Sequence, residues 1–337
     1  MDFQDDLNHY GRVIAGLESV HEHINYNAGI DVDGTYALTV LELHAQDAGE
    51  VAGTEGFLDA VKRGATNIYE WIKKLIATIR DWFRTSKVDK EAERLDQLSK
   101  QFGLGVSGAD LKRMGARKLI QVLLAAKQPE RAGNERIGID AIAEEVDKMS
   151  PEQLKQVEIY LASITDDPEY KEAVKEEHDF VVNKAMTAIK PRLVEMNNLL
   201  EQMKEADPDG SAAKALGIEP GRDFSQFSNL LTKIDHVSSS TLSNVTGSIG
   251  RGVVDANKLL KSATDKLDVL NNQNKTNGGP VVSQAARIVK LLGTLVEVGR
   301  KLVAQLVVIM EKGEYNALSV FISRRWYEAR TQFAAIK

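Results

Sequence analysis

Two short patterns in this chain have spacings that occur in cation sites. Glu18 and His21 form a Glu-x-x-His pair, the spacing with which a helix presents a carboxylate and an imidazole to a di-metal site. Such a site needs a second pair and two further carboxylates on facing helices, and the residue three positions before His178 is Lys175. We therefore predict no metal ligand and no cofactor, and we expect the histidines to lie at the surface.

Two further segments begin like calcium loops but fail the template. Asp31-Val32-Asp33-Gly34 and Asp207-Pro208-Asp209-Gly210 carry glycine at position 4 instead of position 6 and lack the ligand at position 5. Asp, Asn and Gly in such clusters are typical of turns, which is the interpretation adopted for both segments. Gly247, Gly250 and Gly252 are not preceded by a strand pattern and are not followed by Gly-Lys-Ser/Thr, so they predict a close helix crossing or a hinge instead of a phosphate loop.

No catalytic constellation stands out elsewhere. The chain has no cysteine, which excludes disulfides, thiolate metal sites and cysteine nucleophiles. No Ser/His/Asp set, paired catalytic carboxylates or dinucleotide fingerprint is recognisable. We therefore predict a non-enzymatic protein, with an enzyme whose site is assembled from scattered polar residues as one alternative.

The most distinctive segment is an amphipathic helix predicted at residues 68–84. Its polar side carries Lys73, Lys74, Arg80 and Arg84, which are candidate contacts for an anionic partner. From residue 62 to residue 87 there are seven basic and two acidic residues, whereas residues 1–55 are acidic. A wide apolar face with aromatic residues, opposite Lys and Arg, fits either a core helix of a bundle or a helix that meets a membrane or a partner. The candidate membrane or partner face comprises Ile68, Trp71, Ile72, Leu75, Ile79, Trp82 and Phe83.

The overall composition limits the class of protein. The 337 residues are 43% hydrophobic with a net charge of −6, so bulk electrostatics do not favour nucleic-acid binding by the whole chain. The apolar run at residues 302–310 is shorter than the ~20 residues that a membrane-spanning helix needs. The first residues are acidic and contain no signal-peptide apolar region, so we expect a chain that is soluble when made.

Helical periodicity dominates, and no strand alternation is convincing. These patterns predict an all-α fold, an elongated multi-helix bundle with long helices and no sheet. Pro191 is expected to kink or break one long helix. The predicted domains are an acidic helical segment at 1–55, a basic amphipathic helix with its extension at 56–128, a linker at 129–138 and a long-helix bundle at 139–337. The predicted helices cover residues 3–26, 35–46, 68–84, 88–101, 109–127, 139–148, 169–206, 224–236, 238–271, 281–310 and 313–337. A further helix is predicted to start at Ser150-Pro151-Glu152-Gln153, with a Ser cap and Pro at the first helical position.

The order of motifs in residues 1–85 resembles that of internal virion proteins of large tailed bacteriophages. The resemblance rests on Gly16-Leu17-Glu18-Ser19, on Gly29–Asp33 leading into a short helix at Tyr36–Leu43, on a small-x-Glu-Gly junction, and on the Trp/Ile/Lys-rich helix at Ile68–Phe83. In that family, the junction resembles a site cut by the prohead maturation protease. The matching residues here are Gly53, Thr54, Glu55 and Gly56, with Gly53 where the family often has Ser or Ala.

The resemblance implies a bacteriophage structural protein of the capsid interior that undergoes proteolytic maturation and is ejected with the DNA. Its implied partners are other virion proteins, further copies of itself, and genome DNA or a membrane surface. It would reside in the virion, and in the host cytoplasm during assembly. A second alternative is a membrane-active protein of the pore-forming type, which would use the helices at Ser238–Asn271 and Val281–Met310.

Overall fold

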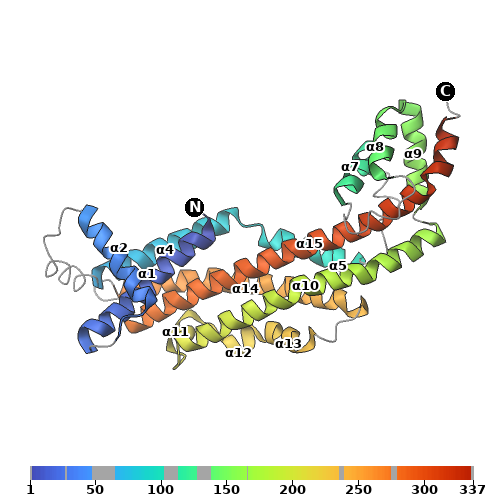
Figure 1. Ribbon diagram of the computed structural model, residues 1–337. Helices are drawn as coiled ribbons and strands as arrows, with labels where there is room; N and C mark the ends of the chain where they lie inside the picture. The colour runs from blue at the N-terminus through green and yellow to red at the C-terminus, as the bar shows by residue number, and fades with distance from the viewer. Residues whose placement is uncertain are drawn as a thin grey trace. The chain divides into compact units, whose positions relative to one another are not determined.

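The computed structural model describes residues 2–26, 29–47, 65–101, 113–126, 138–164, 166–234, 239–274 and 279–334. Within these ranges the chain forms thirteen helices and no strand, so the predicted all-α fold is confirmed (Figure 1). The chain divides into two compact units, each built from three separate segments. Unit 1 comprises Met1–Lys90, Arg192–Thr232 and Arg251–Lys301, and unit 2 comprises Glu91–Pro191, Lys233–Gly250 and Leu302–Lys337.

Three long helices contribute to both units: α10 (Pro168–Ala206), α14 (Ser239–Gln273) and α15 (Pro280–Ala334). The two units therefore do not coincide with the divisions at 55, 128 and 138 that the sequence suggested. The remaining helices of unit 1 are α1 (Phe3–Tyr26), α2 (Val32–Asp47), α4 (Ala65–Thr85), α11 (Ser211–Leu216), α12 (Pro220–Asp223) and α13 (Ser225–Lys233). Unit 2 contains most of α5 (Val88–Gln101), together with α7 (Ala116–Ala126), α8 (Ile139–Asp147) and α9 (Pro151–Ile164).

Several helix starts follow directly from local sequence. Ser150 and Gln153 form a capping box at α9, because the Gln153 backbone N–H donates to Ser150 Oγ over 3.3 Å and the Ser150 backbone N–H donates to Gln153 Oε1 over 2.9 Å. Asp31 caps α2 by accepting a hydrogen bond of 2.6 Å from the Gly34 backbone N–H. This cap starts α2 at Val32, three residues earlier than predicted.

Other segments differ from the prediction. The helices expected at 281–310 and 313–337 are one continuous helix, α15. Gly313 lies inside this helix, at a position where a Cβ would overlap Val181 of α10. Helix α10 also continues through Pro191, so the chain has no break there, and a kink at this residue stays a prediction. Helix α7 begins only at Ala116, after Gly115 at a φ of 76°. The loop expected after α10 contains the short helices α11 and α12.

The glycines of α14 serve a close helix crossing, and α14 is unbroken across them. A Cβ at Gly252 would lie only 2.8 Å from Phe227 Cζ of α13. The close helix crossing predicted from these glycines is confirmed at Gly252, where α14 packs against α13.

Gly16 sets the approach of α1 to α2, and this predicts an effect on stability. A Cβ there would overlap the backbone carbonyl oxygen of Asp33, which cannot move aside as a side chain could. We expect Gly16→Ala to lower the free energy of unfolding by about 1–3 kcal/mol through overpacking, despite the ~1 kcal/mol that Ala gains in helix propensity. Gly250→Ala is the matched control, because its Cβ would lie 3.5 Å from the nearest atom, an ordinary contact. Urea unfolding of both variants measures the two changes in the free energy of unfolding. Equal changes for Gly16→Ala and Gly250→Ala would contradict the prediction.

Candidate functional site

The apolar face of α4 lies in the core of unit 1. Ile72, Leu75 and Ile79 are fully buried, and Trp71 and Trp82 are 6% and 7% exposed. Much of the cover comes from α1, which lies beside α4 (Figure 1). In the folded chain this face is therefore an internal contact, as expected for a core helix, because burying it within unit 1 removes its apolar area from water. A role of the same face toward a membrane or a partner stays a prediction. Ile68 and Phe83, at the edges of this face, are half-buried.

Aromatic contacts join α1 to α4 at both ends of this face. The rings of Phe3 and Trp82 stack with centroids 4.6 Å apart and an interplanar angle of 20°. Near the other end, Tyr10 and His9 approach Trp71 with centroids 5.7 and 5.6 Å away. Such pairs add about 0.5–1.5 kcal/mol each beyond area burial, so α1 is fixed on α4 by specific contacts.

Helices α1 and α2 form an acidic hairpin, defined as residues 2–47, which carries nine acidic residues and one basic residue. That basic residue, Arg12, binds Asp33 with Nε and Oδ1 3.0 Å apart, and its guanidinium lies 4.1 Å from the centroid of Tyr36. His9 and Tyr36 are joined by a hydrogen bond of 2.8 Å. The hairpin is thus closed by polar contacts between its two helices as well as by apolar ones.

A partly buried charged seam links the hairpin to α15. Burial raises the pKa of Glu18 to about 7, against the opposing effects of Arg287 and of a hydrogen bond from Ser283 on α15. Burial also lowers the pKa of Lys290 on α15, while Asp33 acts in the opposite direction. Sequence reasoning considered Glu18 as a metal ligand and as part of the Gly16–Ser19 motif, because nothing in the local pattern shows that α15 covers it.

The four cations predicted on α4 have different surroundings. Lys73 lies 3.9 Å from Glu70, and Lys74 Nζ lies 4.7 Å from the ring centroid of Trp71. Arg84 Nη2 binds Asp81 on the same helix over 2.6 Å. Arg80 instead reaches α14, where its Nη2 binds Asp268 Oδ2 at 2.9 Å and Asp265 Oδ1 at 3.4 Å. Carboxylates of the same molecule thus already contact three of the four cations that were predicted to bind an anionic partner, namely Lys73, Arg80 and Arg84.

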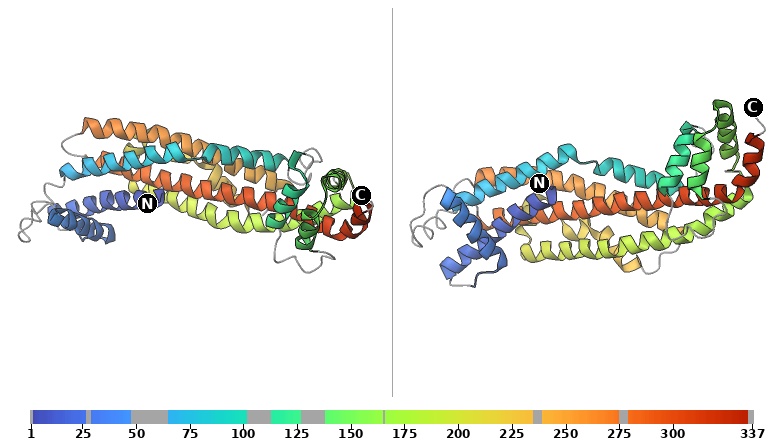
Figure 2. Two further views of the ribbon diagram at one scale, coloured as in Figure 1. Left: turned by 90° about the horizontal axis from the view of Figure 1, so that it is seen from above. Right: turned by 45° about the horizontal axis from the view of Figure 1, so that its top comes forward.

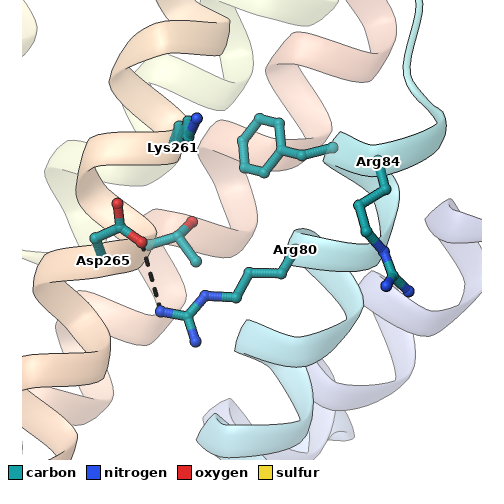
Figure 3. A pocket seen from close by; sticks show the side chains of 6 residues that line it. Arg80, Arg84, Lys261 and Asp265 are labelled. Atoms are coloured by element: carbon teal, nitrogen blue, oxygen red, sulfur yellow. Dashed lines mark hydrogen bonds and ion pairs between the residues drawn. The ribbon is translucent and has the colours of Figure 1, made fainter.

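Two of these cations line a pocket between α4 and α14, which run alongside one another in unit 1 (Figure 2). Its volume is about 340 Å³. In Figure 3, Arg80 extends from α4 to Asp265 of α14, Lys261 stands on the α14 side, and Arg84 stands on the α4 side. The full lining is Arg80, Phe83, Arg84, Lys261, Thr264 and Asp265. We call this set the α4–α14 pocket.

The α4–α14 pocket is lined by three cations and one carboxylate, and two of the cations already bind carboxylates. Both hydrogen bonds of Arg80 use Nη2, so Nε and Nη1 have no partner among the residues that the structure describes. By contrast, Arg300 on α15 binds Glu297 through both Nε and Nη2. Burial acts to lower the pKa of Arg80, but hydrogen bonds and charge attraction from Asp268 and Asp265 outweigh it and raise the pKa. The guanidinium therefore stays charged and oriented.

The remaining predictions concern the processing junction, the calcium-like segments, metal binding and membrane spans. The junction residues Gly53, Thr54, Glu55 and Gly56 lie outside the described residues. Asp207 caps α11, since its carboxylate accepts hydrogen bonds of 3.1 and 2.7 Å from the backbone N–H groups of Ala212 and Ala213. In the described part of the chain, no group of three or more His, Asp or Glu residues is placed to hold a metal ion. None of the helices described there has the length and apolar character needed to cross a bilayer.

Sequence reasoning missed the α14 side of the pocket, which consists of Lys261, Thr264 and Asp265. These residues lie on the polar edge of a long helix, and no local pattern shows which other helix packs beside them. Comparison with known proteins found no matching family model, no similar curated protein and no similar solved structure. Fold and site together define an all-α protein with a buried aromatic face on α4 and a pocket lined by charged side chains beside it.

Proposed function

We propose that this protein is a non-enzymatic structural protein of a bacteriophage capsid interior, which acts through contacts with other virion proteins. The observation that carries the proposal is the cover of α4 by the acidic hairpin. An acidic segment ahead of a basic amphipathic helix fits the proteolytic maturation that the resemblance implies, and the aromatic contacts to Trp71 and Trp82 give this segment a physical role. The hairpin keeps the apolar face of α4 out of water.

Removal of residues 1–55 would change what α4 presents. Trp71 and Trp82 would lose the ring contacts from α1, and an apolar patch would become accessible beside the cations of α4. Large exposed apolar patches mark contact sites for proteins or membranes. Maturation at Gly53–Gly56 would thus convert an internal contact into a binding face for another virion protein.

Mass spectrometry of purified particles tests the proposal. We expect the protein in the particles, with its first residue at Gly56. Glu55→Gln should leave the chain starting at its original N-terminus, whereas Glu50→Gln, a matched change outside the junction, should leave processing intact. Absence from the particles would overturn the capsid location, and an intact start at Met1 in mature particles would overturn the maturation step.

A further inference from the structure

We propose that the chain bends at a joint built from Pro191 of α10, Gly250 of α14 and Gly299 of α15. The joint lets unit 1 and unit 2 move as separate bodies, although they share three long helices. This inference does not rest on where the protein resides or on whether its N-terminal segment is removed.

The six segments of the two units meet at five borders, and each border falls at a weakness in a helix. One border lies in the first turn of α5, after Val88, and another lies at Lys233, where α13 ends. The other three fall inside the long helices: directly after Pro191, directly after Gly250, and two residues after Gly299. Proline and glycine weaken the interior of a helix more than any other residue does. The borders therefore coincide with the points at which these helices bend most easily.

Pro191 weakens α10 at an exposed position. Its nitrogen carries no hydrogen, so the backbone hydrogen bond from residue 191 to the carbonyl of Thr187 is not made. Both residues are exposed, so water can reach that carbonyl when the helix bends. Sharp bends of helices occur at proline and at glycine. The core does not require an exposed proline in the interior of this 39-residue helix, whereas a joint is favoured by it.

Gly250 weakens α14 at a position where packing does not demand a glycine. A Cβ there would lie 3.5 Å from the carbonyl oxygen of Ala92 and 3.8 Å from Leu95, which are ordinary contacts. By contrast, a Cβ at Gly252 would approach Phe227 to 2.8 Å, so Gly252 is the glycine that the crossing with α13 needs. Alanine would fit at position 250 and would favour the helix, so the backbone freedom of glycine explains the residue better than packing does.

Gly299 brings the three long helices together beside these two positions. A Cβ there would overlap Val253 of α14 and would lie 3.5 Å from Met196 of α10. Pro191 is five residues from Met196, and Gly250 is three residues from Val253. The weak points of the three helices thus lie within about two turns of one another. This alignment matters because helices packed side by side can bend together only where each of them can yield.

Distances between spin labels test the joint in the full chain, which has no cysteine of its own and so takes labels only at introduced cysteines. Asp179→Cys and Gln202→Cys place labels at exposed positions of α10 on either side of Pro191. Lys171→Cys and Thr187→Cys, also exposed on α10, lie on one side of it and form the control pair. Bending adds distances shorter than the ~35 Å that a straight helix gives the first pair. We expect a broader distribution for the first pair than for the control pair, and equal widths would overturn the proposal.

Substitutions test the two residues that packing does not explain. Pro191→Ala combined with Gly250→Ala should narrow the distribution of the first pair to the width of the control pair, because alanine restores the missing hydrogen bond and favours the helix. Pro220→Ala combined with Gly221→Ala is the matched control on α12, where a Cβ at residue 221 meets open space. It should leave the distribution as broad as in the natural chain. Equal narrowing by both double variants, or no narrowing by the first, would overturn the proposal.

Discussion

Glu18→Gln is expected to raise the free energy of unfolding at pH 8 and to remove most of its decrease between pH 5 and pH 8. Burial, the largest cause, raises the pKa of Glu18 from 4.5 to about 7 in the folded chain. The folded state therefore holds this proton more tightly than the unfolded state does. The stabilisation is complete below about pH 4.5, declines as the pH rises, and is lost above about pH 7, a difference of about 3 kcal/mol.

Lys290, in the same charged seam, gives the free energy of unfolding the opposite dependence on pH. Burial lowers its pKa, so the unfolded chain binds this proton more tightly, and stability rises as the pH increases through the lowered value. Glu18→Gln leaves that rise in place, because the amide removes only the carboxylate titration. The two contributions are thus separable by substitution.

Urea unfolding at several pH values between 5 and 8 checks this prediction. Glu42→Gln is the control, because Glu42 is an exposed carboxylate on α2 of the same hairpin. It should leave the pH dependence of the natural chain unchanged. Parallel pH profiles for Glu18→Gln and the natural chain would show that the carboxylate of Glu18 is not responsible.

Local sequence was enough for most helices and for several of their ends. The bounds of α1 were predicted correctly from apolar spacing and those of α5 from a charged helical pattern that ends before a glycine-containing segment. Ser150 with Gln153 indicated the start of α9. The helix break predicted before Gly313 was wrong. It was expected because glycine is a weak helix former by itself. Only the packing of Val181 against it explains why a glycine is suited to the middle of α15.

The surroundings of α4 were beyond the reach of sequence patterns. Amphipathic spacing shows that one face must be buried, but it is the same whether the cover is α1, a membrane or a second protein. The α4–α14 pocket could not be predicted from sequence patterns either, since Arg80 and Asp265 are 185 positions apart in the chain. Contacts at that separation are decided by the packing of whole helices, which no local motif encodes.

Trp82→Ala is expected to lower the free energy of unfolding by about 3–5 kcal/mol, because the indole is nearly buried and its loss leaves a cavity in unit 1. Phe3→Ala removes the stacked ring from α1, and the double variant should reveal a coupling energy of about 0.5–1.5 kcal/mol. Tyr26→Ala, at a tyrosine of α1 that is 78% exposed, is the matched control and should change little.

Urea unfolding of the two single variants, the double variant and the control gives the coupling energy directly. A coupling near zero, with Trp82→Ala no more harmful than Tyr26→Ala, would mean that α1 does not cover α4 in solution. A measurable coupling would place the hairpin on α4 before any processing. The apolar face could then become a binding face only after the hairpin leaves, since α1 and an external partner compete for the same surface.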